Sequence, residues 1–247
     1  MPRPLTWRIA SVVELRRETP SACTLVLDVP EWPGHRAGQH IDVRLTAEDG
    51  YQAQRSFSIA SAPETPYVEL TIERIEGGEV SPYLADELVV GDELEVRGPI
   101  GLPFTWSVDD GGPLLLAAGG SGLVPLMSML RHRAAHTSTI PARALISVRT
   151  EQDALYFDEL QAIGPRDGLD VRWTYTRAAA PTHGFHGRVS AEMLAQLVPG
   201  ELLTSTTAPP RSFVCGPTGF VETVASLLVE AGQDPMRIHT ERFGPTG

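Results

Sequence analysis

Cysteine is scarce in this chain, and its scarcity excludes two kinds of structure. Cys23 and Cys215 are the only two cysteines, so they cannot form a disulfide framework. Two thiols also cannot supply the four ligands of an iron–sulfur cluster within these 247 residues. So few cysteines favour a reducing compartment, and we expect a cytoplasmic location.

Positive charge is scarce as well. The chain has 20 lysines and arginines against 31 aspartates and glutamates, which gives a net charge of −11. Proteins that bind nucleic acid need clustered cations for the phosphates, whereas the arginines here are scattered apart from the pair Arg16–Arg17. We therefore expect no nucleic-acid partner.

Long apolar runs are also missing. The longest, residues 114–118, is far shorter than the roughly 20 residues that a membrane-spanning helix needs. Residues 1–10 lack the apolar stretch of a signal peptide. We expect no membrane insertion. A hydrophobic content of 42% and a charged content of 21% are those of a globular protein, and the length allows two domains.

The first hundred residues have the period-2 pattern of half-buried strands. Apolar and polar residues alternate in residues 24–29, 40–45 and 68–75, with glycine and proline between these runs. Closely spaced strands separated by turns predict a small antiparallel barrel. One helix interrupts it: Ser81 suits the N-cap, Pro82 the first helical position, and residues 83–88 continue it.

The pattern changes at residue 114. Residues 114–118 are continuously apolar, as in a parallel strand that is covered on both faces, and a glycine turn and a helix follow. Alternating strands and helices then predict a doubly wound parallel sheet. The expected strands are residues 144–148, 170–175 and 212–215, and the expected helices are residues 156–163, 190–198 and 218–231, with ends marked by Gly164–Pro165 and Gly232. We place the domain boundary within residues 98–112.

The turn Gly119–Pro125 joins the first parallel strand to its helix. Glycines allow a pyrophosphate to approach the backbone, and a helix N-terminus offers free N–H groups with a positive dipole end. The ordinary dinucleotide fingerprint has a third glycine where this chain has Pro125. By itself the turn is equally compatible with phosphate binding and with a plain tight turn.

Three further segments allow both a binding role and a structural one. Arg55-Ser56-Phe57-Ser58, at the start of an expected strand, could pair with a diphosphate and meet a flat ring, or could be a solvated strand. The turn from Gly77 to Leu84 could hold a phosphate or simply be capped by Ser81. Cys215, within Phe213–Pro217, could line a site at the carboxyl end of a strand or be a buried apolar residue.

The order and spacing of these segments resemble the ferredoxin–NADP reductase family over almost the whole chain. Arg55–Ser58 is similar to the family's R-x-Y-S flavin motif, with Gly38-Gln39-His40 upstream. Gly78–Ser81 is similar to its diphosphate turn, Gly119–Pro125 to its nicotinamide loop, and Val214–Pro217 to its C-G-P segment. Within the family the chain resembles bacterial single-flavin reductases that serve oxygenases or ferredoxins, without an iron–sulfur domain.

The resemblance implies a fold and a flavin site. Residues 1–105 would form an FAD-binding β-barrel domain, and residues 106–247 an NAD(P)-binding α/β domain. Arg55 would hold the diphosphate, Phe57 would stack on the isoalloxazine ring in place of the usual tyrosine, and Ser58 would hydrogen-bond near flavin N5. The diphosphate turn favours FAD over FMN. The residues implied for flavin binding are Arg55, Ser56, Phe57, Ser58, Gly78, Val80 and Ser81.

The resemblance also implies a nicotinamide site. Gly120 and Gly122 would accommodate the pyrophosphate of NADPH or NADH, with Gly216 and Pro217 nearby and Cys215 near the reacting carbon. Phe243 would cover the other flavin face, or would only anchor the C-terminus. The family's nearby carboxylate corresponds to Glu241. The residues implied for catalysis are Ser58, Cys215 and Glu241.

Coenzyme choice depends on groups around the ribose. Thr176 and Arg177, after the third parallel strand, and Arg149, after the second, could bind the 2′-phosphate of NADPH, or could be solvated loop ends. We expect NADPH. His132 and His136 stand four apart on a helix, but with no third ligand nearby we interpret them as surface histidines and expect no metal.

The resulting hypothesis is a reductase that takes hydride from NAD(P)H onto FAD and passes single electrons to a separate ferredoxin, oxygenase component or other redox protein. One alternative is a flavin reductase that releases reduced flavin. Another is a non-catalytic subunit that only binds nucleotides. An acidic ferredoxin would need a local basic patch on this acidic chain, to which Arg16, Arg17 and Arg36 could contribute.

Overall fold

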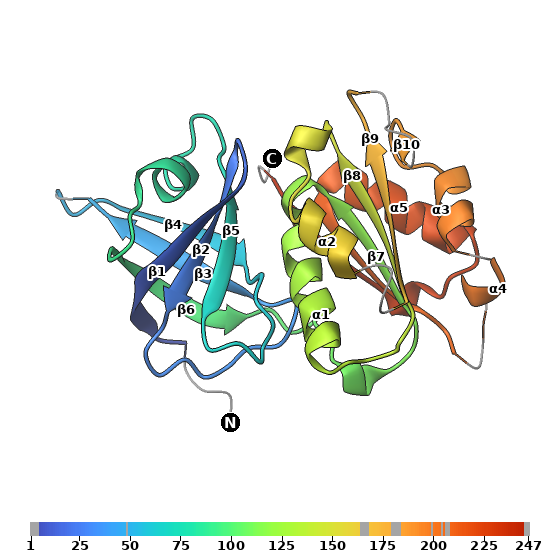
Figure 1. Ribbon diagram of the computed structural model, residues 1–247, viewed down its shortest axis with the longest axis horizontal. Coiled ribbons are helices and arrows are strands. Elements are labelled where there is room, and N and C mark those ends of the chain that lie inside the picture. The colour runs from blue at the N-terminus through green and yellow to red at the C-terminus, as the bar shows by residue number, and fades with distance from the viewer. Residues whose placement is uncertain are drawn as a thin grey trace.

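The computed structural model describes residues 5–47, 49–163, 168–178, 184–198, 200–203, 205 and 208–244. These residues form two lobes that lie side by side, an all-β lobe and an α/β lobe (Figure 1). In the described part of the chain, no helix combines the length and the apolar character needed to cross a membrane.

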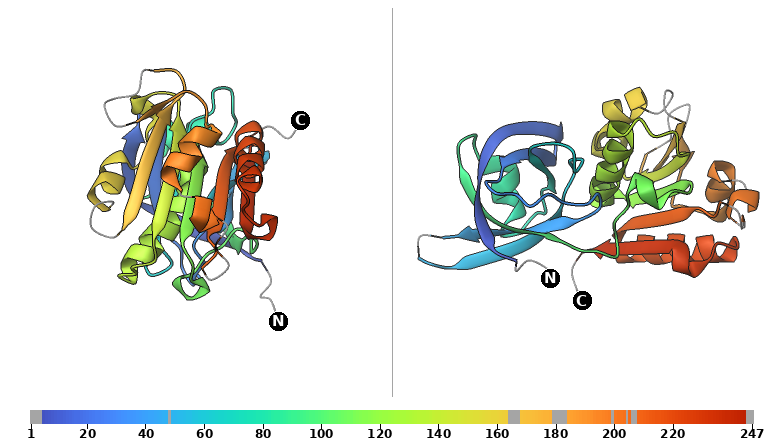
Figure 2. Two further views of the ribbon diagram at one scale, coloured as in Figure 1. Left: turned by 90° about the vertical axis from the view of Figure 1, so that its right-hand side faces the viewer. Right: turned by 90° about the horizontal axis from the view of Figure 1, so that it is seen from below.

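The first lobe is a six-stranded antiparallel sheet that curls into a barrel (Figure 2, right). Its strand order is β4-β3-β6-β1-β2-β5, and a bridge between Ile59 and Leu70 joins the two edges. The alternating apolar residues fill the interior, which confirms the predicted barrel. The strands are β1 (Trp7–Thr19), β2 (Ala22–Asp28), β3 (His40–Thr46), β4 (Gln52–Ser58), β5 (Val68–Glu73) and β6 (Glu93–Ile100).

The second lobe is a parallel sheet with the strand order β10-β9-β8-β7-β11-β12. Every residue of the central strand β7 is buried, as its unbroken apolar run predicted. The strands are β7 (Leu114–Gly119), β8 (Ala142–Val148), β9 (Leu169–Tyr175), β10 (Phe185–His186), β11 (Arg211–Pro217) and β12 (Ile238–Phe243). The α-helices are α1 (Leu123–Ala135), α2 (Phe157–Ile163), α3 (Ala191–Leu197), α4 (Gly200–Leu203) and α5 (Thr218–Glu230).

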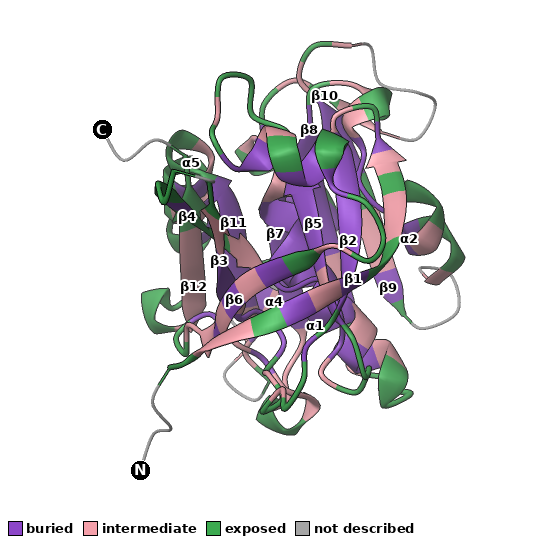
Figure 3. Ribbon diagram, turned by 90° about the vertical axis from the view of Figure 1, so that its left-hand side faces the viewer, coloured by how far each residue is buried: buried purple, intermediate pink, exposed green. Residues whose placement is uncertain are grey.

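The two lobes share a packed interface. Ala22, Ala37 and Ala60 of the barrel lie in the same buried cluster as α1 and α2 of the second lobe. Figure 3 shows this seam from the barrel side, with buried strands of the second lobe behind the barrel. Because these contacts exclude water, the lobes have a defined relative position rather than a loose tether.

Two local expectations were wrong. Ser81 does not cap the short helix: the helical turn η1 (Tyr83–Glu87) has the wider π geometry, its N-cap is Pro82, and the Ser81 hydroxyl instead accepts a hydrogen bond from the Ile75 N–H at 3.0 Å. Arg55 lies in the middle of β4, not at a strand start. The end expected at Gly164–Pro165 lies outside the described residues, whereas Gly232 follows α5 with a positive φ of 93°, as a helix-terminating glycine does.

The surroundings of His35 predict that the folded protein is less stable in acid. Its Nε2 donates to the Ser61 carbonyl and its Nδ1 accepts from Trp32, an arrangement that suits the neutral ring. Burial lowers the pKa of His35, despite opposing effects from Ser61 and Glu64. The folded-state pKa is below the unfolded value, so this stability is complete above about pH 6.5 and is lost as pH falls through the folded-state pKa.

We therefore expect the melting temperature to fall by roughly a few degrees between pH 7 and pH 5, and His35→Gln to reduce that fall. The measurement is thermal unfolding across this range, with the exposed His186→Gln as the control. An equal acid shift in wild type and His35→Gln would remove His35 as a cause.

Candidate active site at the seam between the domains

The strand β4 lies at the edge of the barrel sheet and carries Arg55, Phe57 and Ser58. An edge strand has one row of backbone N–H and C=O groups without a neighbouring strand, which a bound molecule can use. Arg55 is 57% exposed, and its guanidinium reaches the Glu79 carboxylate at 3.4 Å. This weak, exposed ion pair leaves Arg55 available to a stronger anion.

Ser56 differs from its expected role. Its hydroxyl donates to Asp42 at 2.6 Å, and Asp42 also accepts from the Arg97 guanidinium at 2.6 Å. Burial would raise the pKa of Asp42, but the bonds from Ser56 and Arg97 outweigh burial and hold the pKa below its ordinary value. The Ser56 hydroxyl therefore stabilises a buried carboxylate of the barrel.

The three residues expected to be catalytic lie along one line across the seam. Ser58 of β4 pairs with His40 of β3, and His40 Nδ1 lies 3.6 Å from the Glu241 carboxylate of β12. Glu241 in turn lies opposite Cys215 of the neighbouring strand β11 in the register of the sheet. The structure thus joins Ser58, Glu241 and Cys215 through His40, which the sequence placed in a motif without giving it a role.

Glu241 has one oxygen without a partner. Its Oε2 is buried and forms no hydrogen bond with any described residue, whereas Oε1 faces His40. An unsatisfied buried carboxylate oxygen is costly, and such atoms in a cleft are typical of sites that receive a ligand. Phe243 lies two residues further along β12, on the same face, and is 38% exposed.

Cys215 contributes through its position. The side chain is 2% exposed and lies in the apolar cluster with Phe213 and α1. Burial, together with the nearby Glu241 carboxylate, raises the pKa of the Cys215 thiol well above its ordinary value. The thiol therefore stays protonated, and it presents a small apolar surface rather than a nucleophile.

The glycine loop after β7 is shaped by two different constraints. Gly120 has a positive φ of 56° and open space where a Cβ would be, so its backbone is accessible to a ligand. A Cβ on Gly122 would lie 2.1 Å from the Cys215 carbonyl oxygen, and one on Gly216 would lie 2.8 Å from the Phe220 ring. Gly122 therefore lets the loop touch β11, a packing role that the motif alone did not reveal.

The turn before η1 is tightly folded around Ser81. A Cβ on Gly78 would lie 3.0 Å from the Ile75 carbonyl oxygen and 3.3 Å from Ser81 Oγ. Val80 is 1% exposed and packs into the barrel core. Ser81 and Val80 therefore point inward, whereas the Glu79 side chain between Gly78 and Val80 is exposed and faces Arg55.

Thr176, Arg177 and Arg149 meet at the carboxyl ends of β8 and β9. The Arg177 N–H donates to the Arg149 carbonyl at 2.9 Å, and the Thr176 hydroxyl donates to the Val148 carbonyl at 3.2 Å. Both arginines are exposed, and neither guanidinium has a bonding partner among the described residues.

The interpretation of His132 as a surface residue was wrong. His132 is 7% exposed: its Nε2 accepts from the Val108 N–H, and its Nδ1 donates to Glu64 of the barrel at 2.7 Å. The sequence showed no third possible metal ligand near His132 and the exposed His136, whereas the structure brings the Glu64 carboxylate close to both. Because the His132 proton lies on Nδ1, this atom holds the two domains together as a donor.

A separate cleft of about 800 Å³ lies between the domains, against α1 and α2. Its walls include Arg16, Arg131 and Tyr156. The view from below separates the two regions: α1 and α2, in green and yellow, are on one side of the parallel sheet, and β12 and the C-terminus are towards the other (Figure 2, right). This cleft is therefore distinct from the line of residues through His40.

Comparisons with known proteins match both lobes. Residues 11–104 match the family model described as an oxidoreductase FAD-binding domain, and residues 116–226 match that of an oxidoreductase NAD-binding domain. The ferredoxin–NADP reductase B of Sorangium cellulosum is 34% identical over 210 residues, which cover 84% of this chain and 84% of that protein.

Other relatives are longer. The glycine betaine monooxygenase reductase subunit of Pseudomonas aeruginosa is 33% identical over 85% of this chain, but this chain spans only 57% of it. Among solved structures, the FAD/NAD-binding domain of a nitric oxide dioxygenase from Vibrio cholerae has a TM-score of 0.84 at 25% identity, over 96% of this chain and 99% of that one. A cytochrome P450 reductase from Amycolatopsis also has a TM-score of 0.84, at 26% identity, over 100% of this chain and 72% of that one.

The fold, the glycine loop, the seam residues and these matches agree with one another, and the chain belongs to the ferredoxin–NADP reductase family of FAD- and NAD(P)-binding oxidoreductases.

Proposed function

We propose that this protein is an NAD(P)H-dependent reductase that uses bound FAD to pass electrons to a separate redox protein. One observation carries the proposal: the unpartnered Glu241 oxygen lies at the seam where both matched domains contribute residues. Ser58 and His40 come from the FAD-binding domain, and Glu241 and Cys215 lie on neighbouring strands of the other domain.

The residues present fit the cofactor. The Arg55 guanidinium can turn from Glu79 to the diphosphate, and the backbone of Gly78–Ser81 can approach it. Phe57 offers an aromatic surface, and Ser58 offers a hydroxyl beside His40. When bound, FAD supplies the ability to take two electrons as hydride and release them one at a time. The protein supplies alignment and water exclusion, because Glu241, His40 and the buried Cys215 thiol fix the walls of the seam.

We further propose that residues 1–105 form the FAD-binding unit and residues 106–247 the NAD(P)-binding unit. On the NAD(P) side, Gly120 offers accessible backbone for the pyrophosphate, and Gly216 and Pro217 lie beside it at the end of β11. Phe243, partly exposed at the end of β12, is the residue we assign to the open flavin face.

NADPH is the expected coenzyme, because Arg149 and Arg177 present two cations beside Thr176 that have no acidic partner in the described part of the chain. The double variant Arg149→Ala/Arg177→Ala should raise the KM for NADPH about 10–100-fold and change the KM for NADH less than about 3-fold. Steady-state kinetics with both coenzymes measure this. Equal losses for both would contradict a 2′-phosphate site, and Arg172→Ala, at an exposed position earlier in β9 that pairs with Asp170, is the control.

The acceptor is proposed from relatives. Proteins similar to this chain are named as reductase subunits of a glycine betaine monooxygenase and of a naphthalene dioxygenase system, and as a ferredoxin–NADP reductase. We propose an acceptor of the same kind, an oxygenase component or ferredoxin, and a cytoplasmic location. Arg16 and Arg17 are the cations that could attract an acidic acceptor. Arg16 instead pairs with Glu69, and Arg17 bonds to Asp86 and to the Ala85 carbonyl. These contacts weaken the idea of a basic docking patch there.

A second candidate is release of reduced flavin to another enzyme. Two features of Arg55 favour this candidate: its side chain is exposed, and it lies beside the Glu79 carboxylate. A carboxylate near the flavin diphosphate would weaken flavin binding by charge repulsion. A dissociation constant for FAD in the micromolar range or weaker would support it, and flavin retained through gel filtration would exclude it.

The experiment that tests the proposal is anaerobic mixing of purified, FAD-loaded protein with NADPH or NADH. We expect the oxidised flavin absorbance to bleach and a ferredoxin or cytochrome c added afterwards to become reduced. Folded protein that binds FAD but stays unbleached with both coenzymes would reject the reductase and leave the nucleotide-binding subunit as the explanation. Loss of FAD binding in Arg55→Ala links the result to β4.

A further inference from the structure

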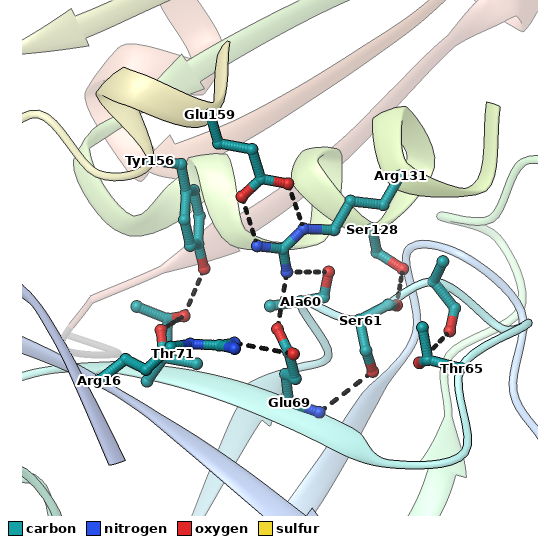
Figure 4. A network of polar contacts seen from close by, with 12 residues as sticks. Arg16, Ala60, Ser61, Thr65, Glu69, Thr71, Ser128, Arg131, Tyr156 and Glu159 are labelled. Atoms are coloured by element: carbon teal, nitrogen blue, oxygen red, sulfur yellow. Dashed lines mark hydrogen bonds and ion pairs between the residues drawn. The ribbon is translucent and has the colours of Figure 1, made fainter. Parts of the chain in front are cut away.

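A polar cluster on the α1 side of the seam fastens the two domains to each other (Figure 4). At its centre, the Arg131 guanidinium of α1 forms a two-bond pair with Glu159 of α2, with Nε and Nη2 at 2.8 and 2.7 Å from the carboxylate oxygens. Its remaining nitrogen, Nη1, donates across the seam to the Ala60 carbonyl at 3.0 Å and to the Glu69 carboxylate at 2.9 Å.

Ser128 provides a second tie from the same face of α1, one turn earlier. Its hydroxyl donates to the Ser61 carbonyl at 2.6 Å, and both atoms are buried. The barrel side is itself braced, because Ser61 Oγ accepts from the Glu69 N–H and Glu69 also pairs with Arg16 at 2.7 Å. The barrel partners of Arg131 and Ser128 are therefore held in place by further bonds.

The points that these ties join are adjacent to the two halves of the proposed active site. Ala60 and Ser61 follow Ser58, the last residue of β4, by only two and three residues. The helix α1 begins directly after the loop Gly120–Gly122 and runs about 12 Å to Arg131 as a rigid rod. The tie at Arg131 therefore connects the helix that carries the loop Gly120–Gly122 (the nicotinamide loop) to the segment that follows β4 (the flavin strand).

A third contact spans the seam beside this cluster. The Tyr156 hydroxyl hydrogen-bonds to Thr71 of β5, while its ring lies 5.1 Å from the Arg131 guanidinium. Tyr156 has a positive φ of 54°, a conformation that is strained for a bulky residue. Strain of this kind persists only where the surroundings hold it, which indicates that this side of the seam has a defined geometry.

We propose that Arg131 is a positioning residue for the reductase reaction: it sets the relative placement of the nicotinamide loop and the flavin strand without touching either ligand. The proposal rests on the proposed function. Hydride moves efficiently only when the donor and acceptor rings lie at close to van der Waals distance, and a misplacement of about 1 Å can reduce the rate about 100-fold. Lysine cannot replace arginine here, since one ammonium cannot serve Glu159, Glu69 and Ala60 in this planar arrangement.

The test uses Arg131→Lys with Arg143→Lys as the matched control. Arg143 pairs with Asp170 at 3.3 Å inside the second domain and does not reach the barrel. We expect Arg131→Lys to slow the single-turnover reduction of bound flavin about 10–100-fold, with coenzyme and FAD dissociation constants within about 3-fold of wild type. The deuterium isotope effect with 4-deuterated coenzyme should persist, and Arg143→Lys should behave like wild type.

A cofactor-free readout separates this proposal from the proposed function. Spin labels on Val89→Cys and Met236→Cys report the distance between the domains, because the two positions are exposed and lie on different domains. The two native cysteines are buried, so they should not take up the label. In protein without flavin, Arg131→Lys should broaden the distance distribution, and Arg143→Lys should not. If broadening occurs while wild-type protein reduces no flavin, only the proposed function fails.

Two results would overturn the proposal: a flavin reduction rate per bound flavin within 3-fold of wild type, or an unchanged distance distribution. Should Arg131→Lys not fold, Glu159→Gln removes the carboxylate that holds the Arg131 guanidinium on the α2 side, and it is subject to the same two criteria. A loss of rate that follows only the loss of bound flavin meets the first of these criteria and contradicts a positioning role.

Discussion

Glu241→Gln should slow the reduction of bound flavin by NAD(P)H about 100-fold. Glutamine keeps the shape of the side chain but loses the charge that faces His40 at 3.6 Å and replaces one acceptor oxygen with a donor. The Oε2 atom has no hydrogen-bond partner among the described residues, so its interactions are free to form with bound molecules. The loss should therefore fall on the reaction rate rather than on coenzyme affinity.

The fold should tolerate this substitution. A buried carboxylate oxygen without a partner is unfavourable, and a neutral amide costs less to bury than a charge, so the substitution should leave the melting temperature unchanged or slightly higher. Stopped-flow absorbance at saturating coenzyme measures the rate, and Glu230→Gln, at an exposed position on α5, is the control. Reduction by Glu241→Gln within 3-fold of wild type would show that Glu241 does not take part in the reaction.

Gly122→Ala should destabilise the protein by about 3 kcal/mol or more. The new methyl group would lie 2.1 Å from the Cys215 carbonyl oxygen and 2.8 Å from the Gly216 amide nitrogen. Both are backbone atoms of a central strand, so neither can move aside as a flexible side chain would. The loop must shift away from β11, and coenzyme binding should weaken together with stability.

Gly219→Ala is the matched control for this prediction. Gly219 lies in the first turn of α5, and a Cβ at this position would have no described atom within 4 Å outside its own helix. Alanine is the better helix former, so this variant should gain up to about 1 kcal/mol. Urea unfolding of both variants gives the comparison; equal stabilities would mean that the loop after β7 can relax without cost.

Regular structure followed from the sequence wherever the periodicity was strong. The continuous apolar run of β7 and the alternation in β3 and β5 each predicted a strand close to its observed bounds. The cap and the π geometry of the short helix after Ser81 were not predicted, because the Ser81 hydroxyl bonds to the Ile75 N–H instead of to the first turn of the helix. Local capping rules do not account for such distant partners.

The candidate site was predicted in part. Motifs identified Ser58, Cys215 and Glu241 separately, but not that His40 would connect them, because that depends on strand pairing across the barrel and on how the domains dock. The same limit applies to His132 and Arg131. On the helix α1 they resemble surface residues, and only the loop at Ala60–Glu64 and the strand β5 supply the partners that bury them.

A crystal structure of the protein with FAD bound is the decisive test of where the flavin lies. We expect the isoalloxazine ring at the seam, with Ser58 within hydrogen-bond distance of the ring and the Glu241 carboxylate on the side open to the nicotinamide. A ring bound instead in the cleft lined by Arg16, Arg131 and Tyr156, or anywhere that leaves Ser58 and Glu241 without contact to the ligands, would contradict this expectation.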